Sequence, residues 1–324
     1  MLKVVKAQGQ GLVSDAGRWG YQHEGVPVGG VLDPFSFTVG NWALGNEGNY
    51  ACLELMGQFD FVCAKTCRVM FANRGAKALL NNKSVLCGQV LNLQEGDVLR
   101  TQPPGQGFWN LLCLQGGVDV PVVMGSRSTC LAAGFGGLQG RALQVGDEIH
   151  AGQAFTAAMS ERLRLATPLA PVDPEGRLLV RCLPGPEFEL LTEDSQRVFF
   201  TQTHRLGNQS SRMGYRLEGE QAPLEMKKAL TLRSHAVHPG VIQLPPSGQP
   251  VVLLSECQVT GGYLRIAAVL GCELWKFAHL GSGQGVHWVV VDAAQAERLQ
   301  LQHDKELRRY HHVIESSDHQ SHVD

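Results

Sequence analysis

The polar stretch VTGGYLR at residues 259–265 decides the fold class, because it lies between two apolar runs, VVLL at Val251–Leu254 and IAAVL at Ile266–Leu270. Apolar runs of four or five residues that end at turn residues are typical of buried β-strands. Two adjacent glycines weaken the interior of a helix or a strand, so Gly261 and Gly262 predict a loop between the strands. We expect this loop to bend at the rim of a barrel and to direct four side chains towards a ligand: Gln258, Thr260, Tyr263 and Arg265. A plain glycine-rich β-turn is the alternative.

Similar short apolar runs occur along the rest of the chain, at spacings of about ten residues that are typical of sandwiches and barrels. The 38 glycines favour a turn-rich protein over a helical one. We therefore predict a mainly β protein with a few short helices. The clearest of the other runs are Leu12–Val13, Val69–Phe71, Phe108–Leu114, Leu178–Cys182 and His287–Val291.

The segment ATPLAPVDPEG at Ala166–Gly176 contains three prolines and little that a core can bury, so we place a domain boundary there. It separates an N-terminal β lobe, residues 1–165, from a C-terminal β-barrel lobe, residues 177–292. Residues 293–324 are expected to form a surface helix and, beyond Ile314, a disordered tail. Shorter helical segments are expected within Asp33–Leu44, which starts with an N-cap aspartate and a proline, and within Phe188–Thr201 and Gln221–Leu230.

The pattern Leu-x-x-Gly-Asp-x-apolar occurs twice, as LQEGDVL at Leu93–Leu99 and LQVGDEI at Leu143–Ile149. A looser copy, LGSGQGV, occupies Leu280–Val286. Glycine next to a short polar side chain is typical of a turn that feeds a new strand, with the glycine at positive φ. The three copies are weak evidence for related barrel-like lobes.

The composition is that of an ordinary globular protein, with 18% charged residues and a formal net charge of −2. That charge argues against nucleic acid or an anionic membrane as the main partner. No apolar run approaches the roughly 18–20 residues that span a bilayer, and the start MLKVVKAQGQG lacks the apolar core of a signal peptide, so we expect a cytoplasmic protein. The nine cysteines are an odd number and mostly lie in apolar context, which indicates free thiols in a reducing compartment.

Motifs for nucleotide, metal and biotin sites are absent or weak. The chain has no Gly-x-x-x-x-Gly-Lys-Ser/Thr phosphate loop. Cys63 and Cys67 have no second pair of ligands nearby in sequence, and His235 and His238 lack an acidic third ligand, so we expect no metal. The segment LEMKK at Leu224–Lys228 lacks the surroundings of a biotin attachment site, so we expect no covalent biotin on this chain.

Two glycine-bound polar segments in the N-terminal lobe are typical of loops that line a pocket. Ser14–Pro34 contains Asp15, Arg18 and His23; the alternative there is an ion pair of Arg18 that holds a surface turn. Gly116–Thr129 offers the donors Ser126 and Arg127, which can hold a carboxylate or phosphate; the alternative is a structural Asp119–Arg127 ion pair.

A third polar segment, Asn208–Gly219, contains two arginines, two serines and a tyrosine around Gly214. On a strand, residues 212, 214 and 216 share one face. We therefore expect Arg212 and Arg216 to point together at an anion. Our working hypothesis is that these polar segments, although distant in sequence, gather around one cavity.

These segments resemble the KipA-like family, also called allophanate hydrolase subunit 2 or biotin-dependent carboxyltransferase-like proteins, and most closely the branch of that family found in 5-oxoprolinase as its C subunit. The resemblance runs from about Leu2 to Asp292. It is carried by the ordered motifs DAGRWGYQHEGVP, LDPFSF, GGVDVPVVMGSRST, FGGLQGRAL, LPGPE, QSSRMGYRLEG, HPGVIQLPPSGQPVVL and QVTGGYLRIA.

The resemblance implies cyclophilin-like β-barrel lobes and membership of an ATP-dependent complex that hydrolyses 5-oxo-L-proline to L-glutamate. It also implies two partner subunits, one KipI-like and one LamB/YcsF-like, with ATP used at a shared site. The expected chemistry is phosphorylation of the lactam oxygen and attack by water, with arginines and amides stabilising the negative charge. The expected catalytic residues are Asp15, Arg18, His23, Arg212 and Tyr215. The expected substrate-binding residues are Ser126, Arg127, Ser210, Gln243, Gln258, Thr260, Gly261, Gly262, Tyr263 and Arg265.

Several residues depart from the family pattern. Ser14 replaces a glutamine, Asn73 falls in a Leu-Thr-Gly-Ala motif, Ser211 replaces aspartate or asparagine, Val259 replaces threonine, and Leu264 replaces proline. Two alternatives therefore stay open: a related enzyme that acts on urea or an allophanate-like amide, and a KipA-type regulatory partner of a KipI-like kinase inhibitor.

Overall fold

The computed structural model describes residues 1–46, 49–104, 107, 109–154, 164–228, 230 and 232–320. The chain divides into two compact units. The N-terminal unit comprises residues 1–18, 29–169 and 304 onward, and the C-terminal unit comprises residues 19–28 and 170–303. The main division falls between Leu169 and Ala170, inside the proline-containing segment 166–176. Over the described residues, the protein contains no helix with the length and apolar character needed to cross a membrane.

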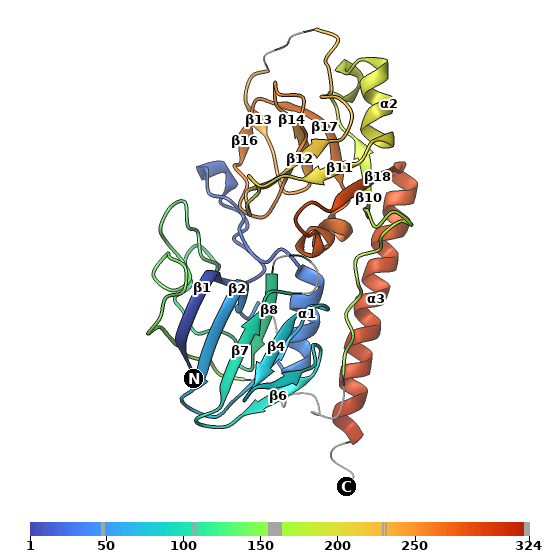
Figure 1. The fold of residues 1–324 in the computed structure, drawn as a ribbon. Helices are drawn as coiled ribbons and strands as arrows, with labels where there is room; N and C mark the ends of the chain where they lie inside the picture. Colours follow the sequence, from blue (N-terminus) through green and yellow to red (C-terminus); the bar gives the residue numbers. More distant parts are fainter. Residues whose placement is uncertain are drawn as a thin grey trace. The chain divides into compact units, whose positions relative to one another are not determined.

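The N-terminal unit is built on a nine-stranded antiparallel sheet (Figure 1). Seven strands follow the order β5-β4-β7-β2-β8-β3-β6, and β1 pairs with β2 and β9. Alternate residues of β2, such as Phe59 and Phe61, point into the core and are fully buried. The strands are β1 Leu2–Ser14, β2 Cys52–Cys63, β3 Cys67–Phe71, β4 Lys77–Leu80, β5 Lys83–Val85, β6 Val90–Leu93, β7 Val98–Gln102, β8 Trp109–Leu114 and β9 Glu148–Ile149.

The helix α1, Pro34–Ala43, forms where the sequence predicts one. Asp33 caps its N-terminus, because its carboxylate accepts a hydrogen bond of 2.9 Å from the backbone N–H of Ser36. The helix packs against β8. At Gly40 the approach is close enough that a Cβ atom would lie 2.6 Å from the Cβ of Ala72. A residue without a side chain is therefore required at this point.

The C-terminal unit contains a closed barrel of seven strands in the order β10-β17-β14-β15-β12-β11-β18 (Figure 1). The barrel closes through the parallel pairing of β10 with β18. Strands β13 and β16 form a separate two-stranded sheet. The strands are β10 Leu178–Pro184, β11 His204–Leu206, β12 Gly214–Gly219, β13 His235–Ala236, β14 Val241–Leu244, β15 Val251–Leu253, β16 Thr260–Gly261, β17 Leu264–Val269 and β18 Gly285–Val290.

Short helices complete the C-terminal unit. The helix α2, Glu193–Thr201, begins after the N-cap Thr192, whose hydroxyl accepts a hydrogen bond of 3.2 Å from Ser195 N. Three 3-10 helices are η1 Gln22–Glu24, η2 Phe188–Leu190 and η3 Gly271–His279.

The three predicted glycine turns share one hydrogen bond. In each, the side chain after the glycine accepts a bond from the backbone N–H three residues earlier: Asp97 at 2.7 Å, Asp147 at 2.7 Å and Gln284 at 3.1 Å. The preceding glycines all have positive φ, and the turns lead into β7, β9 and β18. The prediction of turns that feed strands is confirmed, including the looser third copy.

The predicted mainly β, barrel-containing fold is confirmed. The runs at β15 and β17 are both interior strands, with β14 between them. The last helix, α3, spans Ala293–Gln320. The expected disorder beyond Ile314 is therefore wrong as far as Gln320. Residues 315–320 contain no glycine or proline that would end the helix earlier. The described part of 221–230 is not helical, and Met226 instead forms a bridge with Leu191. Phe108 and residues 321–324 lie outside the described residues.

Candidate functional site

Asp15 is buried in the N-terminal unit and binds the loop that precedes Thr129. Its Oδ1 accepts hydrogen bonds from Ser126 Oγ and Ser128 Oγ, both at 2.6 Å, and from Gly17 N at 2.9 Å. Its Oδ2 accepts from Arg127 N at 2.6 Å and Asn49 Nδ2 at 3.2 Å. A carboxylate has about four acceptor positions, so these donors saturate it. The donors predicted to hold a ligand carboxylate hold the chain's own carboxylate.

Arg18 is also buried and holds the same loop from a second side. Its Nε donates to the carbonyl oxygen of Val123 at 2.9 Å, and its Nη2 donates to that of Ser128 at 3.0 Å. The guanidinium carbon lies 4.8 Å from the ring centre of Phe135, and burial lowers the pKa of Arg18. The polar atoms of Asp15 and Arg18 are therefore paired within the chain and hold this loop in place, and the catalytic roles expected of them stay predictions.

Arg127 binds Asp15 through its backbone N–H and also lines a pocket. The residue is half-buried, and the pocket, of about 460 Å³, is lined by Asp119 as well. No Asp119–Arg127 ion pair is found among the described residues. The structural ion pair, one of the two interpretations for Gly116–Thr129, is therefore not observed. The other interpretation is a ligand site, but the hydroxyls of Ser126 and Ser128 bind Asp15.

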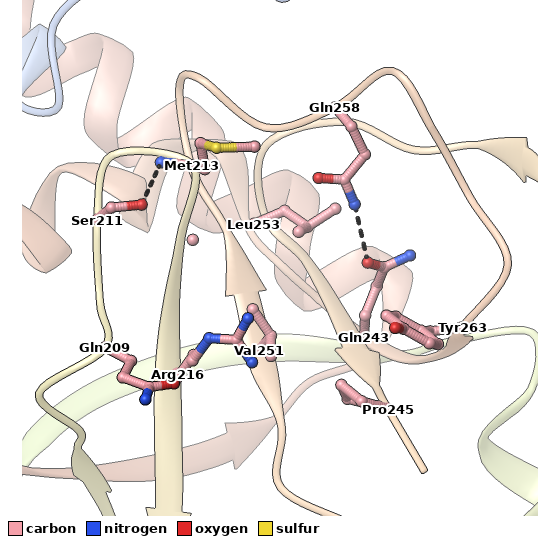
Figure 2. Close-up of a pocket in the computed structure, with 11 residues that line it drawn as sticks. Gln209, Ser211, Met213, Arg216, Gln243, Pro245, Val251, Leu253, Gln258 and Tyr263 are labelled. Carbon is pink, nitrogen blue, oxygen red and sulfur yellow. Dashed lines mark hydrogen bonds between the residues drawn. The ribbon is translucent and has the colours of Figure 1, made fainter. Parts of the chain in front are cut away.

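A second pocket, of about 280 Å³, lies in the C-terminal unit on the outer face of the barrel (Figure 2). Its floor is a row of residues across three adjacent strands, since Arg216 pairs with Val251 and Val251 pairs with Gln243. Residues that are directly opposite on antiparallel strands point to the same face, and their neighbours Tyr215, Val252 and Ile242 point into the barrel and are buried. The pocket is lined by Gln209, Ser211, Met213, Gly214, Arg216, Gln243, Pro245, Val251, Leu253, Gln258 and Tyr263.

Two glutamine amides interact at one side of this pocket. Gln258 Nε2 donates a hydrogen bond of 3.2 Å to Gln243 Oε1 (Figure 2). Gln243 is 1% exposed, and its Nε2 is buried with no hydrogen-bond partner in the described part of the chain. Buried polar groups without a partner are rare and costly, so this amide has unused donor capacity beside the pocket.

Gly261 packs against the same amide. A Cβ atom on Gly261 would lie 2.7 Å from Gln243 Nε2, and one on Gly262 would lie 3.1 Å from the carbonyl oxygen of Leu232. Neither glycine has positive φ. The glycine pair is thus required by the close approach of neighbouring atoms, and the expected sharp bend is not its purpose.

Arg216 lies on the opposite side of the pocket from Gln243. Adjacent strands are about 4.8 Å apart, so Cα atoms two strands apart are separated by about 10 Å. The hydroxyl of Ser210 accepts a hydrogen bond of 3.0 Å from Arg216 N and fixes the start of the strand. The guanidinium of Arg216 is exposed, and neither an ion pair nor a side-chain hydrogen bond of it is found among the described residues.

Two other predicted residues, Arg212 and Arg265, do not line this pocket. Arg212 is buried and donates to Glu256 Oε1 at 2.8 Å, because a turn that joins Ser211 to Gly214 precedes β12 and removes Arg212 from the strand face. Arg212 and Arg216 therefore do not point together, which corrects that prediction. Arg265 binds Glu187 through Nε at 2.9 Å and Nη2 at 2.6 Å, and these hydrogen bonds lower the pKa of Glu187.

The remaining predicted residues have simple surroundings. Tyr215 is buried in the barrel with its ring 6.2 Å from that of Phe277. His23 is exposed in η1, 3.5 Å from Glu24. Thr260 is exposed on β16 and does not line the pocket. The predicted segments thus meet in pairs, Ser14–Pro34 with Gly116–Thr129 and Asn208–Gly219 with the stretch around Tyr263, and a single cavity for all of them stays a prediction.

The sequence matches the family model for the carboxyltransferase domain, subdomains A and B, over residues 24–290. The chain belongs to the carboxyltransferase domain family. Among curated relatives, it is 35% identical to the C subunit of 5-oxoprolinase from Escherichia coli over 303 residues, 91% of this chain and 93% of that protein. It is 29% identical to the C subunit of 5-oxoprolinase from Haemophilus influenzae, over 97% of this chain and 99% of that protein.

A solved structure has the same fold as this chain. The crystal structure of the Kluyveromyces lactis urea amidolyase matches 95% of this chain with a TM-score of 0.84 at 23% identity. The matched part is 20% of the amidolyase chain. At this identity the likeness concerns the fold.

Sequence reasoning identifies only part of the pocket in this carboxyltransferase-domain chain. It predicts Gln243, Gln258 and Tyr263 as substrate-binding residues, and all three line the pocket. It also predicts that Arg216 contacts an anion, but as one of a pair with Arg212, which does not line the pocket. The lining residues that it misses are Gln209, Ser211, Met213, Gly214, Pro245, Val251 and Leu253. The available signal was strand alternation, since Arg216 and Val251 alternate with buried neighbours on β12 and β15.

Proposed function

We propose that this chain is the C subunit of an ATP-dependent 5-oxoprolinase, which hydrolyses 5-oxo-L-proline to L-glutamate. The observation that carries the proposal is the 35% identity to the C subunit of a 5-oxoprolinase over nearly the whole length of both proteins. The designation of that relative as a subunit supports a multi-subunit complex. The partner subunits proposed are one KipI-like and one LamB/YcsF-like protein, with the substrate ATP used at a site shared between subunits.

The pocket on the barrel supports a small polar substrate. Its volume of about 280 Å³ is large enough for a five-membered lactam with one carboxylate. The polar side chains that line it are uncharged amides and hydroxyls apart from Arg216. Amide groups can hydrogen-bond a planar lactam, and a guanidinium can bind a carboxylate. We assign substrate binding to this pocket.

The same residues limit what this chain contributes to the reaction. None of the eleven lining residues is aspartate, glutamate, histidine or lysine. The pocket therefore offers no ordinary general base and no lysine to hold a polyphosphate. This chain would hold and orient the lactam, and the groups that accept a proton and position ATP would come from elsewhere in the complex.

A related substrate is the second candidate. The urea amidolyase fold, with a TM-score of 0.84, favours a planar urea or acyl-urea such as allophanate. Urea has no carboxylate and leaves Arg216 without a partner, whereas allophanate has one. We rank the lactam first because the identity to the C subunit of 5-oxoprolinase, 35%, is higher than that to a urea amidolyase, 28%.

The test is reconstitution of the full complex from purified subunits. We expect release of L-glutamate from 5-oxo-L-proline only when ATP and all subunits are present. Urea and allophanate serve as competing substrates in the same assay, with ATP consumption as the readout. Absence of glutamate release from the assembled complex would remove the proposal, and ATP consumption with urea alone would favour the second candidate.

A further inference from the structure

The pocket on the barrel has a hydrogen-bond donor on each of two sides. At one side the Nε2 of Gln243 is buried without a partner in the described chain. At the other, the guanidinium of Arg216 is exposed and unpaired among the described residues. The amide oxygen of Gln243 already accepts a hydrogen bond from Gln258. A ligand that binds both donors supplies an acceptor to each of them.

We infer that Arg216 binds the carboxylate of the ligand and that Gln243 donates to its carbonyl oxygen, so that the pair selects small amide-bearing carboxylates. This deepens the proposed function and rests on it for the choice of 5-oxo-L-proline as the probe. The inference assigns the two recognition roles to one row of the sheet, with Val251 as an apolar floor between them.

Gln243 is preorganised for this role. Burial at 1% exposure removes its alternative partners in solvent, and the hydrogen bond from Gln258 orients the amide with Nε2 turned away from Gln258. Gly261 makes room for the amide in this position, because a Cβ atom there would lie 2.7 Å from Nε2. A donor held in place before binding loses little conformational entropy when the ligand arrives.

The other arginines near this face are already paired. Arg212 is bound to Glu256 and Arg265 to Glu187, and the row across the sheet passes from Gln243 to Arg265 on β17. Arg216 differs from these two arginines, because Ser210 binds its backbone N–H and its side chain lines the pocket. Arg216 is therefore the anion-binding residue that the structure assigns here.

The test compares three probes on the purified full-length chain, by calorimetric or NMR titration. 5-Oxo-L-proline has both the carboxylate and the lactam carbonyl, 2-pyrrolidinone lacks the carboxylate, and L-proline lacks the carbonyl. Arg216→Ala should weaken 5-oxo-L-proline by about 10- to 100-fold, the range for a hydrogen bond to a charged group, and leave 2-pyrrolidinone unchanged. Arg216→Lys should recover part of the loss. Arg197→Ala, an exposed arginine on α2 that pairs with Asp194, is the matched control and should bind as the wild type does.

The amide is tested separately. Gln243→Leu should weaken both lactams by about tenfold and leave L-proline unchanged. Because Gln243 is buried, Gln258→Leu is the second variant; Gln258 is exposed, so the fold should persist while the orientation of Gln243 is lost. Smaller losses for both lactams are expected with it.

Three results would overturn the inference: no binding of 5-oxo-L-proline to the wild-type chain, equal affinity for 5-oxo-L-proline and 2-pyrrolidinone, or full affinity in Arg216→Ala. Failure of the proposed function is a separate result. It would be seen as probe binding with the expected selectivity by a chain whose reconstituted complex releases no glutamate.

Discussion

The Nε2 atom of Gln243 lies 2.7 Å from the position that a Cβ atom on Gly261 would occupy. The two residues come from different elements, β14 and β16, and both belong to the surroundings of the pocket on the barrel. Contacts this short do not occur between real Cβ atoms and their neighbours. The amide can keep its position only while residue 261 is glycine.

Gly261→Ala should therefore impair ligand binding more than folding. The added methyl displaces the Gln243 amide, and we expect affinity for 5-oxo-L-proline to fall by about tenfold, as for the loss of one hydrogen bond. Overpacking usually lowers the free energy of unfolding by about 1–3 kcal/mol. We expect a smaller loss here, because the end of the Gln243 side chain can move. Calorimetric titration and urea unfolding measure the two effects.

Gly271→Ala is the control for this substitution. A Cβ atom at Gly271 meets nothing within 4 Å, and Gly271 lies in η3 of the same unit. We expect wild-type affinity and stability. Equal affinity in Gly261→Ala and Gly271→Ala would contradict the proposed role of the Gln243 amide.

Asp15→Asn should destabilise the N-terminal unit. The amide replaces one acceptor oxygen by a donor, which faces donors such as Ser126 Oγ or Arg127 N. Leaving buried donors without acceptors costs about 1–3 kcal/mol for each group, so we expect a loss of about 3 kcal/mol or more in the free energy of unfolding. Chemical denaturation of the purified chain measures it.

The exposed Asp119 provides the comparison for Asp15. Asp119→Asn should change the free energy of unfolding by no more than about 0.5 kcal/mol, as is usual for surface substitutions. If Asp15→Asn is as stable as Asp119→Asn while the reconstituted complex loses activity, Asp15 would be a catalytic residue after all, and the structural role assigned above would be wrong.

The sequence was sufficient for most of the elements and for part of the pocket. Apolar runs, glycine turns and the Asp33 cap each act within a few residues, and the structure has the predicted strands, turns and α1. It was also sufficient for Gln258 and Tyr263, because they are close in sequence to the glycine pair.

Long-range pairing explains what could not be predicted. Arg265 is bound by Glu187 and Asp15 by Ser126, partners separated by 78 and 111 residues. Nothing near Arg265 in the sequence reveals that its guanidinium is occupied. Asn73, one of the departures from the family pattern, is similar: its amide bridges Trp109 O and Leu111 N on β8 and so supports the sheet.

Gly40→Val should loosen the contact of α1 with the sheet. A Cβ atom at Gly40 would lie 2.6 Å from Ala72 Cβ and 2.9 Å from Cys113 Sγ, and the Cβ of Ala72 cannot rotate away because the backbone fixes its position. We expect a loss of about 2–3 kcal/mol in the free energy of unfolding, within the range for overpacked cores. Thr38→Ala on the same helix should stay within about 0.5 kcal/mol of the wild type. A valine variant as stable as the wild type would show that the helix moves freely.

His204 makes stability depend on pH. The imidazole is fully buried, with Nε2 3.0 Å from the carbonyl oxygen of Phe199 and Nδ1 without a partner in the described chain. Burial lowers the pKa of His204 from 6.5 to about 4. The unfolded chain therefore binds a proton below pH 6.5 that the folded chain refuses until about pH 4, so the free energy of unfolding falls as pH falls through this window.

A shift of this size corresponds to about 3 kcal/mol, present in full at pH 7 and above and lost by about pH 4. His204→Gln removes the titrating group but keeps a donor for Phe199 O, so the difference in unfolding free energy between wild type and variant should narrow as pH falls from 7 to 4. His238→Gln, at an exposed position, should follow the wild-type curve. Urea unfolding at pH 7.0, 6.0, 5.0 and 4.5 measures the three curves. Parallel curves for wild type and His204→Gln would mean that the pKa of His204 is the same in the folded barrel as in the unfolded chain, because only a difference between these two pKa values produces the slope.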